Sequence, residues 1–168
     1  MTKSCVIVEN YINDKQEKEL IDYIWKLPEQ IKTVEGQRIW NFGYEHVLDG
    51  CIFNEATDVP KIVKQYMPDT FNQCTIYEHL SPKIGKKKYT EHNGYSKIAI
   101  LNLEAKVKLE VFKPNQRDDY VINRRSLLLI DPIIEFPQRV LNMEKVMRHL
   151  LIFRVVPQLQ IIDEYFHS

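Results

Sequence analysis

The sequence predicts a mainly β protein of the α+β class, in which N-terminal helices pack on the outside of a β-sandwich or jelly roll. Hydrophobic residues recur at helical spacing early in the chain, whereas from residue 72 onwards they occur in short, strand-like segments. The length of 168 residues, with 44% apolar and 27% charged residues, suits one globular domain, and we expect residues 1–168 to form it.

The N-terminal region predicts one strand followed by one helix. Residues 4–8, SCVIV, form a short apolar segment typical of a strand. Asn13 is expected to cap a helix, and Gln16, three residues later, completes a capping box. The apolar stripe that packs this helix against a sheet consists of Leu20, Ile21, Ile24, Trp25 and Leu27.

A strand over 37–44 that closes at Gly43 comes next, followed by a short helix over 58–67 with Pro60 in its first turn. Cys74 and Trp40 are expected in the core, as is Trp25. The later strands are expected at 72–80, 95–103, 106–113, 120–123, 126–130 and 150–156.

Alternation is clearest in 106–113, KVKLEVFK. The apolar residues Val107, Leu109 and Val111 alternate with charged residues, so the two sets should lie on opposite faces of the strand. The following stretch 114–119, PNQRDD, is typical of a hairpin turn.

The charge and the cysteine content limit the possible binding partners and the cellular compartment of the protein. The chain has 23 basic and 23 acidic residues, so nucleic-acid binding would require a local basic patch. Three cysteines without CxxC spacing indicate a reduced, cytoplasmic protein with no zinc knuckle. The chain has no apolar run of about 20 residues and no secretory signal at its start, so we expect no membrane segment.

Four segments occur in an order that points to one family: RIWNFGYE (38–45), FNQCTIYEHLSPKIG (71–85), RRSLLLI (124–130) and RHLLIFR (148–154). Together they resemble AlkB-like 2-oxoglutarate/Fe(II) dioxygenases, most closely the tRNA-modifying branch. The resemblance implies a double-stranded β-helix, a jelly-roll variant. It also implies an iron site made of a His-x-Asp…His triad, with 2-oxoglutarate and O₂ used to oxidise a carbon on nucleic acid.

The resemblance places the His-x-Asp pair near Lys88 and Thr90, and the second histidine near 138–140, QRV. Lysine, with a usual pKa near ~10.4, is a cation at neutral pH and has no lone pair to donate to iron. Threonine offers only a neutral hydroxyl. We therefore expect a degenerate metal site, no cofactor and a catalytically inactive pseudoenzyme.

The expected co-substrate pocket is also altered. The asparagine and tyrosine that contact 2-oxoglutarate in the family fall on Tyr77 and His79, and a small hydroxyl residue falls on Leu150. Arg148 and Arg154 remain, and residues six apart in a strand share one face. They are candidates for binding an anion or a 2-oxoglutarate-like carboxylate. Alternatively, they are surface arginines that are solvated or paired with acidic residues.

A relocated iron site is the main alternative. His79, Glu91 and His92 are candidate ligands, with His149 or Asp131 as a third. Such a site would make the chain an active Fe(II)/2-oxoglutarate-dependent dioxygenase acting on nucleic acid. Against it, His149 should lie on the face of its strand opposite Arg148, and TEHNG (90–94) is typical of a polar turn.

The loop GKKKY (85–89) suggests a different activity. Close lysines neutralise several phosphates, and tyrosines stack on unpaired bases. The alternative is a solvated turn that blocks edge pairing of strands. Our first hypothesis is a binding module for RNA or a ribonucleoprotein, such as tRNA or the ribosome. The candidate contact residues are Lys83, Lys86, Lys87, Lys88, Tyr89, Tyr95, Arg124 and Arg125.

The C-terminal stretch 157–168, PQLQIIDEYFHS, is amphipathic. Ile161, Ile162, Tyr165 and Phe166 fall on one helical face, which is suited to docking on the sheet or on a partner. A protein-binding scaffold that uses this tail is the third hypothesis.

Overall fold

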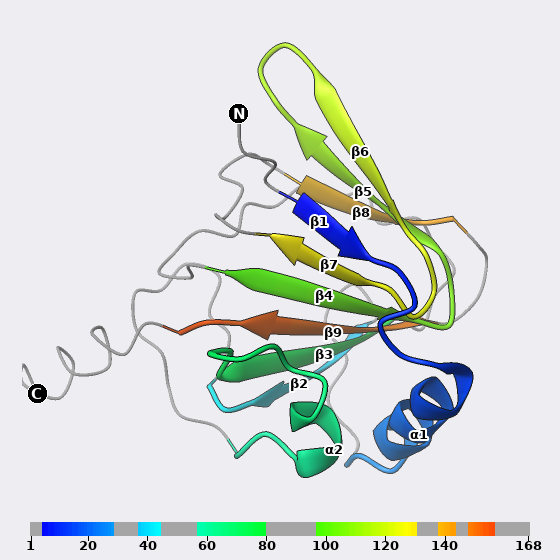
Figure 1. The fold of residues 1–168 in the computed structure, drawn as a ribbon, viewed down its shortest axis with the longest axis vertical. Coiled ribbons are helices and arrows are strands. Elements are labelled where there is room, and N and C mark those ends of the chain that lie inside the picture. Colours follow the sequence, from blue (N-terminus) through cyan, green and yellow to red (C-terminus); the bar gives the residue numbers. More distant parts are fainter. Residues whose placement is uncertain are drawn as a thin grey trace, which may run out of the picture.

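The computed structural model describes residues 5–28, 37–44, 57–79, 97–130, 138–143 and 148–156. Its strands form a six-stranded sheet, in the order β1-β7-β4-β9-β3-β2, and a three-stranded sheet, in the order β6-β5-β8 (Figure 1). In chain order the elements are β1 (Cys5–Val8), α1 (Asp14–Trp25), β2 (Gln37–Phe42), α2 (Lys61–Lys64), β3 (Gln73–His79), β4 (Ile98–Leu103), β5 (Val107–Phe112), β6 (Arg117–Ile122), β7 (Leu127–Ile130), β8 (Gln138–Asn142) and β9 (Arg148–Arg154).

Strand β9 lies inside the larger sheet and pairs antiparallel with β3 on one side and β4 on the other. Arg154 stands opposite Gln73 of β3 and Ile98 of β4, and Arg148 stands opposite His79 at the other end. The arrangement confirms the mainly β class, with α1 preceding most of the strands. No helix in the described part of the chain is long and apolar enough to cross a membrane.

The capping prediction for α1 is confirmed. The Asn13 side chain accepts a hydrogen bond from the Gln16 backbone N–H at 2.8 Å, and the Gln16 side chain accepts one from the Asn13 N–H at 2.9 Å. Leu20 and Ile24 are buried, as the stripe predicted. Trp25 is not a core residue, because 54% of its surface is exposed at the last position of the helix.

Two boundaries differ from the prediction, and one strand was not predicted. Helix α2 covers only Lys61–Lys64, and Pro60 is its N-cap rather than a first-turn residue. The hairpin turn after β5 is tighter than expected, because the Lys113 N–H donates to the Gln116 carbonyl at 2.9 Å and β6 begins at Arg117. Strand β8, which pairs with β5, was not predicted.

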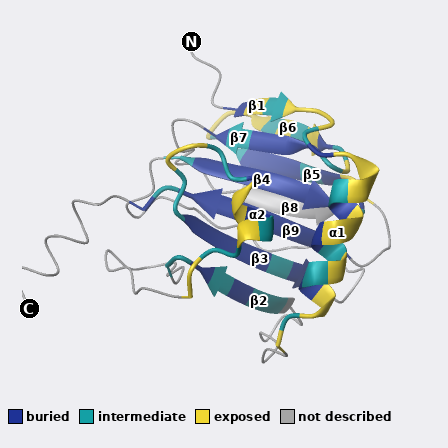
Figure 2. Cartoon of the chain, turned by 60° about the horizontal axis from the view of Figure 1, so that its bottom comes forward, coloured by how far each residue is buried: buried dark blue, intermediate teal, exposed yellow. Residues whose placement is uncertain are grey.

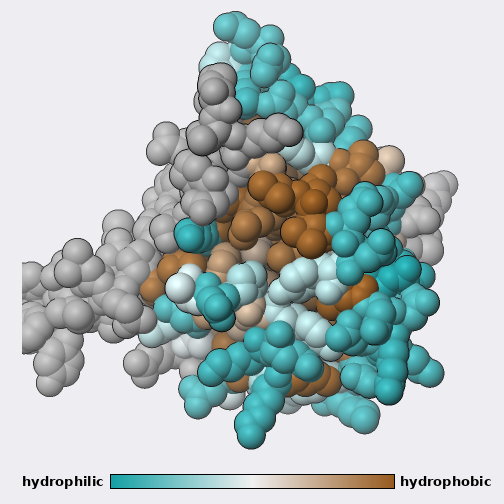
Figure 3. Space-filling view, viewed as in Figure 1, coloured by the Kyte–Doolittle hydropathy of each residue, from teal (hydrophilic) through white to brown (hydrophobic). Residues whose placement is uncertain are grey.

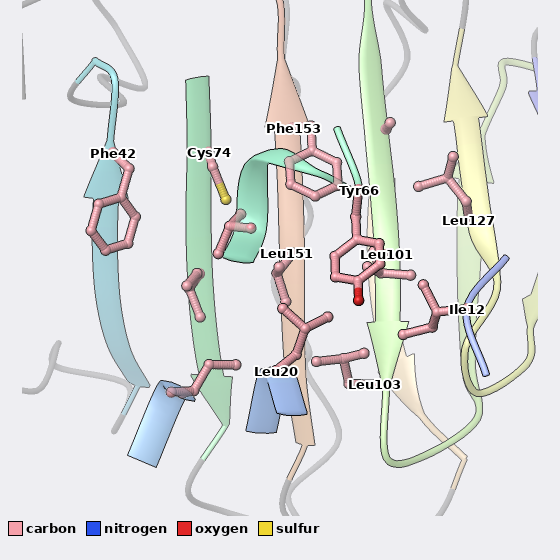
Figure 4. Packing of buried hydrophobic residues seen from close by; sticks show 14 of the residues in the cluster. Ile12, Leu20, Phe42, Tyr66, Cys74, Leu101, Leu103, Leu127, Leu151 and Phe153 are labelled. Atoms are coloured by element: carbon pink, nitrogen blue, oxygen red, sulfur yellow. The ribbon is translucent and has the colours of Figure 1, made fainter. Parts of the chain in front are cut away.

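Two hydrophobic clusters lie on opposite faces of the six-stranded sheet. On one face, Leu151 and Phe153 of β9 pack in a cluster with residues of α1 and the α2 region, including Leu20 and Tyr66 (Figure 4). This cluster also contains Cys74 and Trp40, which confirms their predicted core positions. Burial is concentrated in the central strands of the sheet (Figure 2).

The second cluster lies between the two sheets. Leu150 and Ile152 of β9 pack there with the predicted inward face of β5, Val107, Leu109 and Val111. The alternation predicted for 106–113 is therefore confirmed. Residues of β9 with even numbers face the three-stranded sheet, and those with odd numbers face the helices.

Gly43 closes β2 in a conformation that requires glycine. Its φ is +81°, and a Cβ built on it would lie 2.3 Å from the Asn72 carbonyl oxygen. The Gly43 N–H also donates to the Thr57 carbonyl at 2.7 Å. The backbone at the end of β2 therefore passes so close to Asn72, just before β3, that no side chain fits between them.

We expect Gly43→Ala to lower the free energy of unfolding by about 1–3 kcal/mol, because both the positive φ and the clash with backbone oppose a side chain. Urea denaturation of the two proteins measures the loss. Val121→Ala, at an exposed position of β6, is the control and should change stability by less than about 0.5 kcal/mol. Equal stability of Gly43→Ala and wild type would contradict this account of the turn.

Candidate functional site

The two candidate anion-binding arginines share one face of β9, as their spacing predicted, and this face lies between the two sheets. Both are buried, with 1% of Arg148 and none of Arg154 exposed, so the alternative of solvated surface arginines is wrong. A buried guanidinium is stable only with hydrogen-bond partners in the protein. The surroundings of each arginine therefore decide its role.

Arg154 belongs to an amide and hydroxyl network that crosses three strands. Its Nη1 donates to Gln73 Oε1 at 3.1 Å and to Thr75 Oγ1 at 2.9 Å. Gln73 Nε2 donates to Thr75 Oγ1 at 2.8 Å and to the Tyr44 carbonyl at 3.1 Å. The Thr75 hydroxyl donates to Asn41 Oδ1 at 2.8 Å. These contacts connect β9 to β3 and β2.

Arg148 lies at the other end of β9, beside the positions that the family resemblance assigns to 2-oxoglutarate contacts. Tyr77 stands directly opposite Leu150, and His79 directly opposite Arg148. Tyr77 packs on the inter-sheet cluster that contains Leu150. The structure thus brings Tyr77, Leu150 and Arg148 onto one face, and places His79 in register with them.

His149 faces the helix side of the sheet, opposite the arginines, as its place in the strand predicted. It is fully buried, its Nε2 lies 2.7 Å from Glu78 Oε2, and its Nδ1 contacts Glu104 Oε1. Glu78 also accepts from Arg38, at 2.6 Å from Nε and 2.5 Å from Nη2. The Trp25 ring meets the His149 ring edge-on at 6.1 Å.

We call Arg38, Glu78, His149 and Glu104 the His149 cluster. Burial by itself lowers the pKa of His149, but the hydrogen bond and charge of Glu104, followed by those of Glu78, outweigh it, so the pKa is raised. The protonated ring is therefore stabilised between two carboxylates. Both ring nitrogens are engaged on the helix side, so His149 does not supply a ligand to an iron site between the sheets.

Arg124 and Arg125, two of the predicted RNA contacts, bind helix α1. Arg124 Nε and Nη2 lie 2.7 and 2.5 Å from Oε1 of Glu17, a residue that is itself buried. Arg125 pairs with Asp14 and lies 3.7 Å from Glu17. Hydrogen bonding to Glu17 raises the pKa of Arg124 despite its partial burial. Any RNA contact by these arginines has to compete with these ion pairs.

Sequence reasoning did not find the His149 cluster or the role of Glu17. Glu78 and His149 are 71 positions apart and become neighbours only through the β3–β9 register. Within the described residues, no group of three or more His, Cys, Asp or Glu side chains is arranged to hold a metal ion. Several predicted positions lie outside the described residues: Lys83, Lys86, Lys87, Lys88, Tyr89, Tyr95, Glu91, His92, Asp131 and the tail 157–168, as do the side chains of His79 and 138–142.

No protein-family profile matches the chain. No curated protein sequence matches it either.

The fold is similar to solved 2-oxoglutarate/Fe(II) oxygenases. A structure of OsALKBH1 superposes with a TM-score of 0.62 at 10% identity, covering 92% of this chain and 99% of that one. An oxidoreductase of the 2OG-Fe(II) oxygenase family from Burkholderia pseudomallei gives 0.63 at 8% identity, with 90% and 83% coverage. A Pseudomonas putida prolyl-4-hydroxylase gives 0.61 at 12% identity, with 93% and 94% coverage. At 8–12% sequence identity, this structural similarity establishes the fold alone.

We expect the contribution of His149 to stability to depend on pH. Because its pKa is raised in the folded chain, this contribution is fully present below the unfolded value of about 6.5 and is lost as pH rises through the folded value. The free energy of unfolding should therefore differ more between wild type and His149→Gln at pH 6 than at pH 9. Urea titrations at both pH values measure the difference, and a gap that widens with pH would refute the charged-ring account.

Proposed function

We propose that this protein is a catalytically inactive binding module on the double-stranded β-helix fold of AlkB-like oxygenases, and that it binds RNA. The fold similarity and the four ordered sequence segments support the fold part of the proposal. The residues at the positions where the family binds iron support inactivity. The composition of the loop around residues 83–95 supports RNA as the partner.

The main observation is that the residues at the expected iron positions do not fit Fe(II). The motif order puts Lys88 and Thr90 at the His-x-Asp positions. For the second histidine, the β5–β8 register places Gln138 opposite Val111 and Val140 opposite Leu109, two residues of the inter-sheet face. The β8 sequence, QRVLN, contains no histidine. An ammonium group, a hydroxyl and an amide do not replace imidazole and carboxylate ligands.

Arg154, one of the two arginines, has a structural explanation that does not need a cofactor. Arg154 bonds to Gln73 and Thr75 and so connects β9 to its neighbours. Its presence in the family motif is therefore compatible with an inactive chain. On this proposal, ligand recognition depends on other residues of the chain.

The loop around residues 83–95 carries the groups that bind single-stranded RNA. Lys83 and the run Lys86–Lys88 can neutralise several phosphates, and Tyr89 and Tyr95 can stack on unpaired bases. The resemblance to the tRNA-modifying branch favours RNA over other polyanions. A chain of zero net charge needs such a local cluster to attract a nucleic acid at all.

We expect the chain to bind a folded tRNA with an affinity that falls as salt increases. Changing Lys86, Lys87 and Lys88 together to Glu should abolish binding at 150 mM salt. Each lysine–phosphate contact contributes about 0.7–0.9 to the slope of log K against log salt, so three contacts contribute about 2–3. Fluorescence anisotropy at four salt concentrations measures the slope.

The matched control for this experiment changes three exposed lysines to Glu: Lys15 and Lys18 on α1, and Lys26 at its C-cap. It changes net charge by the same amount without altering residues 85–89 and should weaken binding much less. Binding that ignores salt, or that falls equally in both variants, would refute the role of the loop.

A second prediction separates the inactive module from an active enzyme with relocated ligands. We expect anaerobic Fe(II) with 2-oxoglutarate to leave Tm unchanged. A ligand that binds only the native state, at 100 times its Kd, would stabilise by about 2.7 kcal/mol, or several degrees in a chain of this size. A clear rise in Tm that is lost in His79→Ala or His92→Ala would overturn the proposed inactivity.

A further inference from the structure

The helices cover only part of the larger sheet. On the helix side, Leu151 and Phe153 of β9 are fully buried, whereas on β1 Val6 and Val8 are 52% and 42% exposed. The β1–β7 register places Leu129, which is only partly buried, opposite Val6. Figure 3 shows a continuous apolar patch over β1 and β7. We call Val6, Val8 and Leu129 the open β1–β7 face.

An exposed apolar face at the edge of a sheet favours association unless something covers it. Strand β1 reads CVIV and carries no charge, and it forms the edge of the six-stranded sheet. A contiguous exposed apolar patch marks a surface that another segment or molecule covers. The open face continues the apolar layer that packs under α1 and α2, so a covering segment would extend that layer.

The chain that follows β9 starts from a fixed point on the same sheet. The Val156 N–H donates to Asn72 Oδ1 at 2.7 Å, and Asn72 Nδ2 donates to the Val156 carbonyl at 3.0 Å. Val155 N–H donates to the Lys97 carbonyl at 3.2 Å. One register row leads from this point across the sheet to β1: Arg154, Ile98, Ile130 and Cys5.

The distance from β9 to β1 matches the length that residues 157–168 can span. Three strand spacings separate β9 from β1, or about 15 Å in total. Residues 157–160 in extended form reach up to about 14 Å, and eight helical residues from 161 onwards span about 12 Å. Four strand residues span about 13 Å, so a two-turn helix matches the length of β1.

The sequence of the segment also suits the face. Ile161, Ile162, Tyr165 and Phe166 fall on one side of a helix, while His167 falls opposite them. We infer that residues 161–168 form a short amphipathic helix that packs on the open β1–β7 face of the same molecule. The inference is independent of RNA binding.

A double-mutant cycle on the full chain tests the contact. The tail variant combines Ile162→Ser and Phe166→Ser, and the face variant is Val8→Ser. We expect each to lower Tm by about 2–4 °C. If the two sites touch, the combined variant loses clearly less than the sum, because either change alone already breaks the contact. Val6→Ser, on the same face, should couple in the same way.

Two control substitutions lie outside the proposed contact. His167→Ser, on the opposite side of the helix, should leave Tm unchanged, and Val121→Ser, at a site of 42% exposure on β6, should add to the tail variant without coupling. Additive losses for Val8 and Val6 would overturn the inference. So would a wild-type dimer in sedimentation velocity that Val8→Ser dissociates and the tail variant leaves intact, because a second copy would then cover the face.

Discussion

Strand β9 places three basic side chains inside the protein, and the rest of the fold is arranged around their charge. Arg148, His149 and Arg154 are each at most 1% exposed. Burying an ionised group without partners is strongly unfavourable, so strands next to β9 have to supply carboxylate, amide or hydroxyl oxygens. Alternation sends Arg148 and Arg154 to one face and His149 to the other. Each face therefore needs its own set of partners.

On the helix side, the partners of His149 connect sheet and helix into one network. Glu104 contacts His149 through its carboxylate, and its N–H donates to Glu17 Oε2 at 3.0 Å. Glu17 in turn binds Arg124, just before β7. Helix α1 is thus attached by charge as well as by Leu20 and Ile24. A buried ion-pair network adds little net stability over apolar packing, but it fixes one register, since any shift would leave a buried charge unpaired.

Local features of the fold could be predicted from the sequence, and non-local ones could not. The capping box at Asn13 and the alternation of β5 depend on residues a few positions apart. The His149 cluster depends on the pairing of β3 with β9, which periodicity does not specify. Strand β8, QRVLN, has too few alternating residues to be distinguished from a loop. Trp25 fitted the helical stripe but lies in the last turn, beyond the edge of the apolar core, and packs on His149 instead.

Arg148 and Arg154, the two arginines that the sequence resemblance singles out, have different surroundings. Arg154 bonds neutral side chains of β3 within a network that extends to β2, so the fold itself is a sufficient reason for its presence. Arg148 lies beside Tyr77 and Leu150, where the resemblance expects an amide and a small hydroxyl. A ligand carboxylate that needed those two groups would meet an aromatic ring and an aliphatic side chain. An arginine is therefore weak evidence for a cofactor site when its hydrogen bonds, like those of Arg154, connect neighbouring strands.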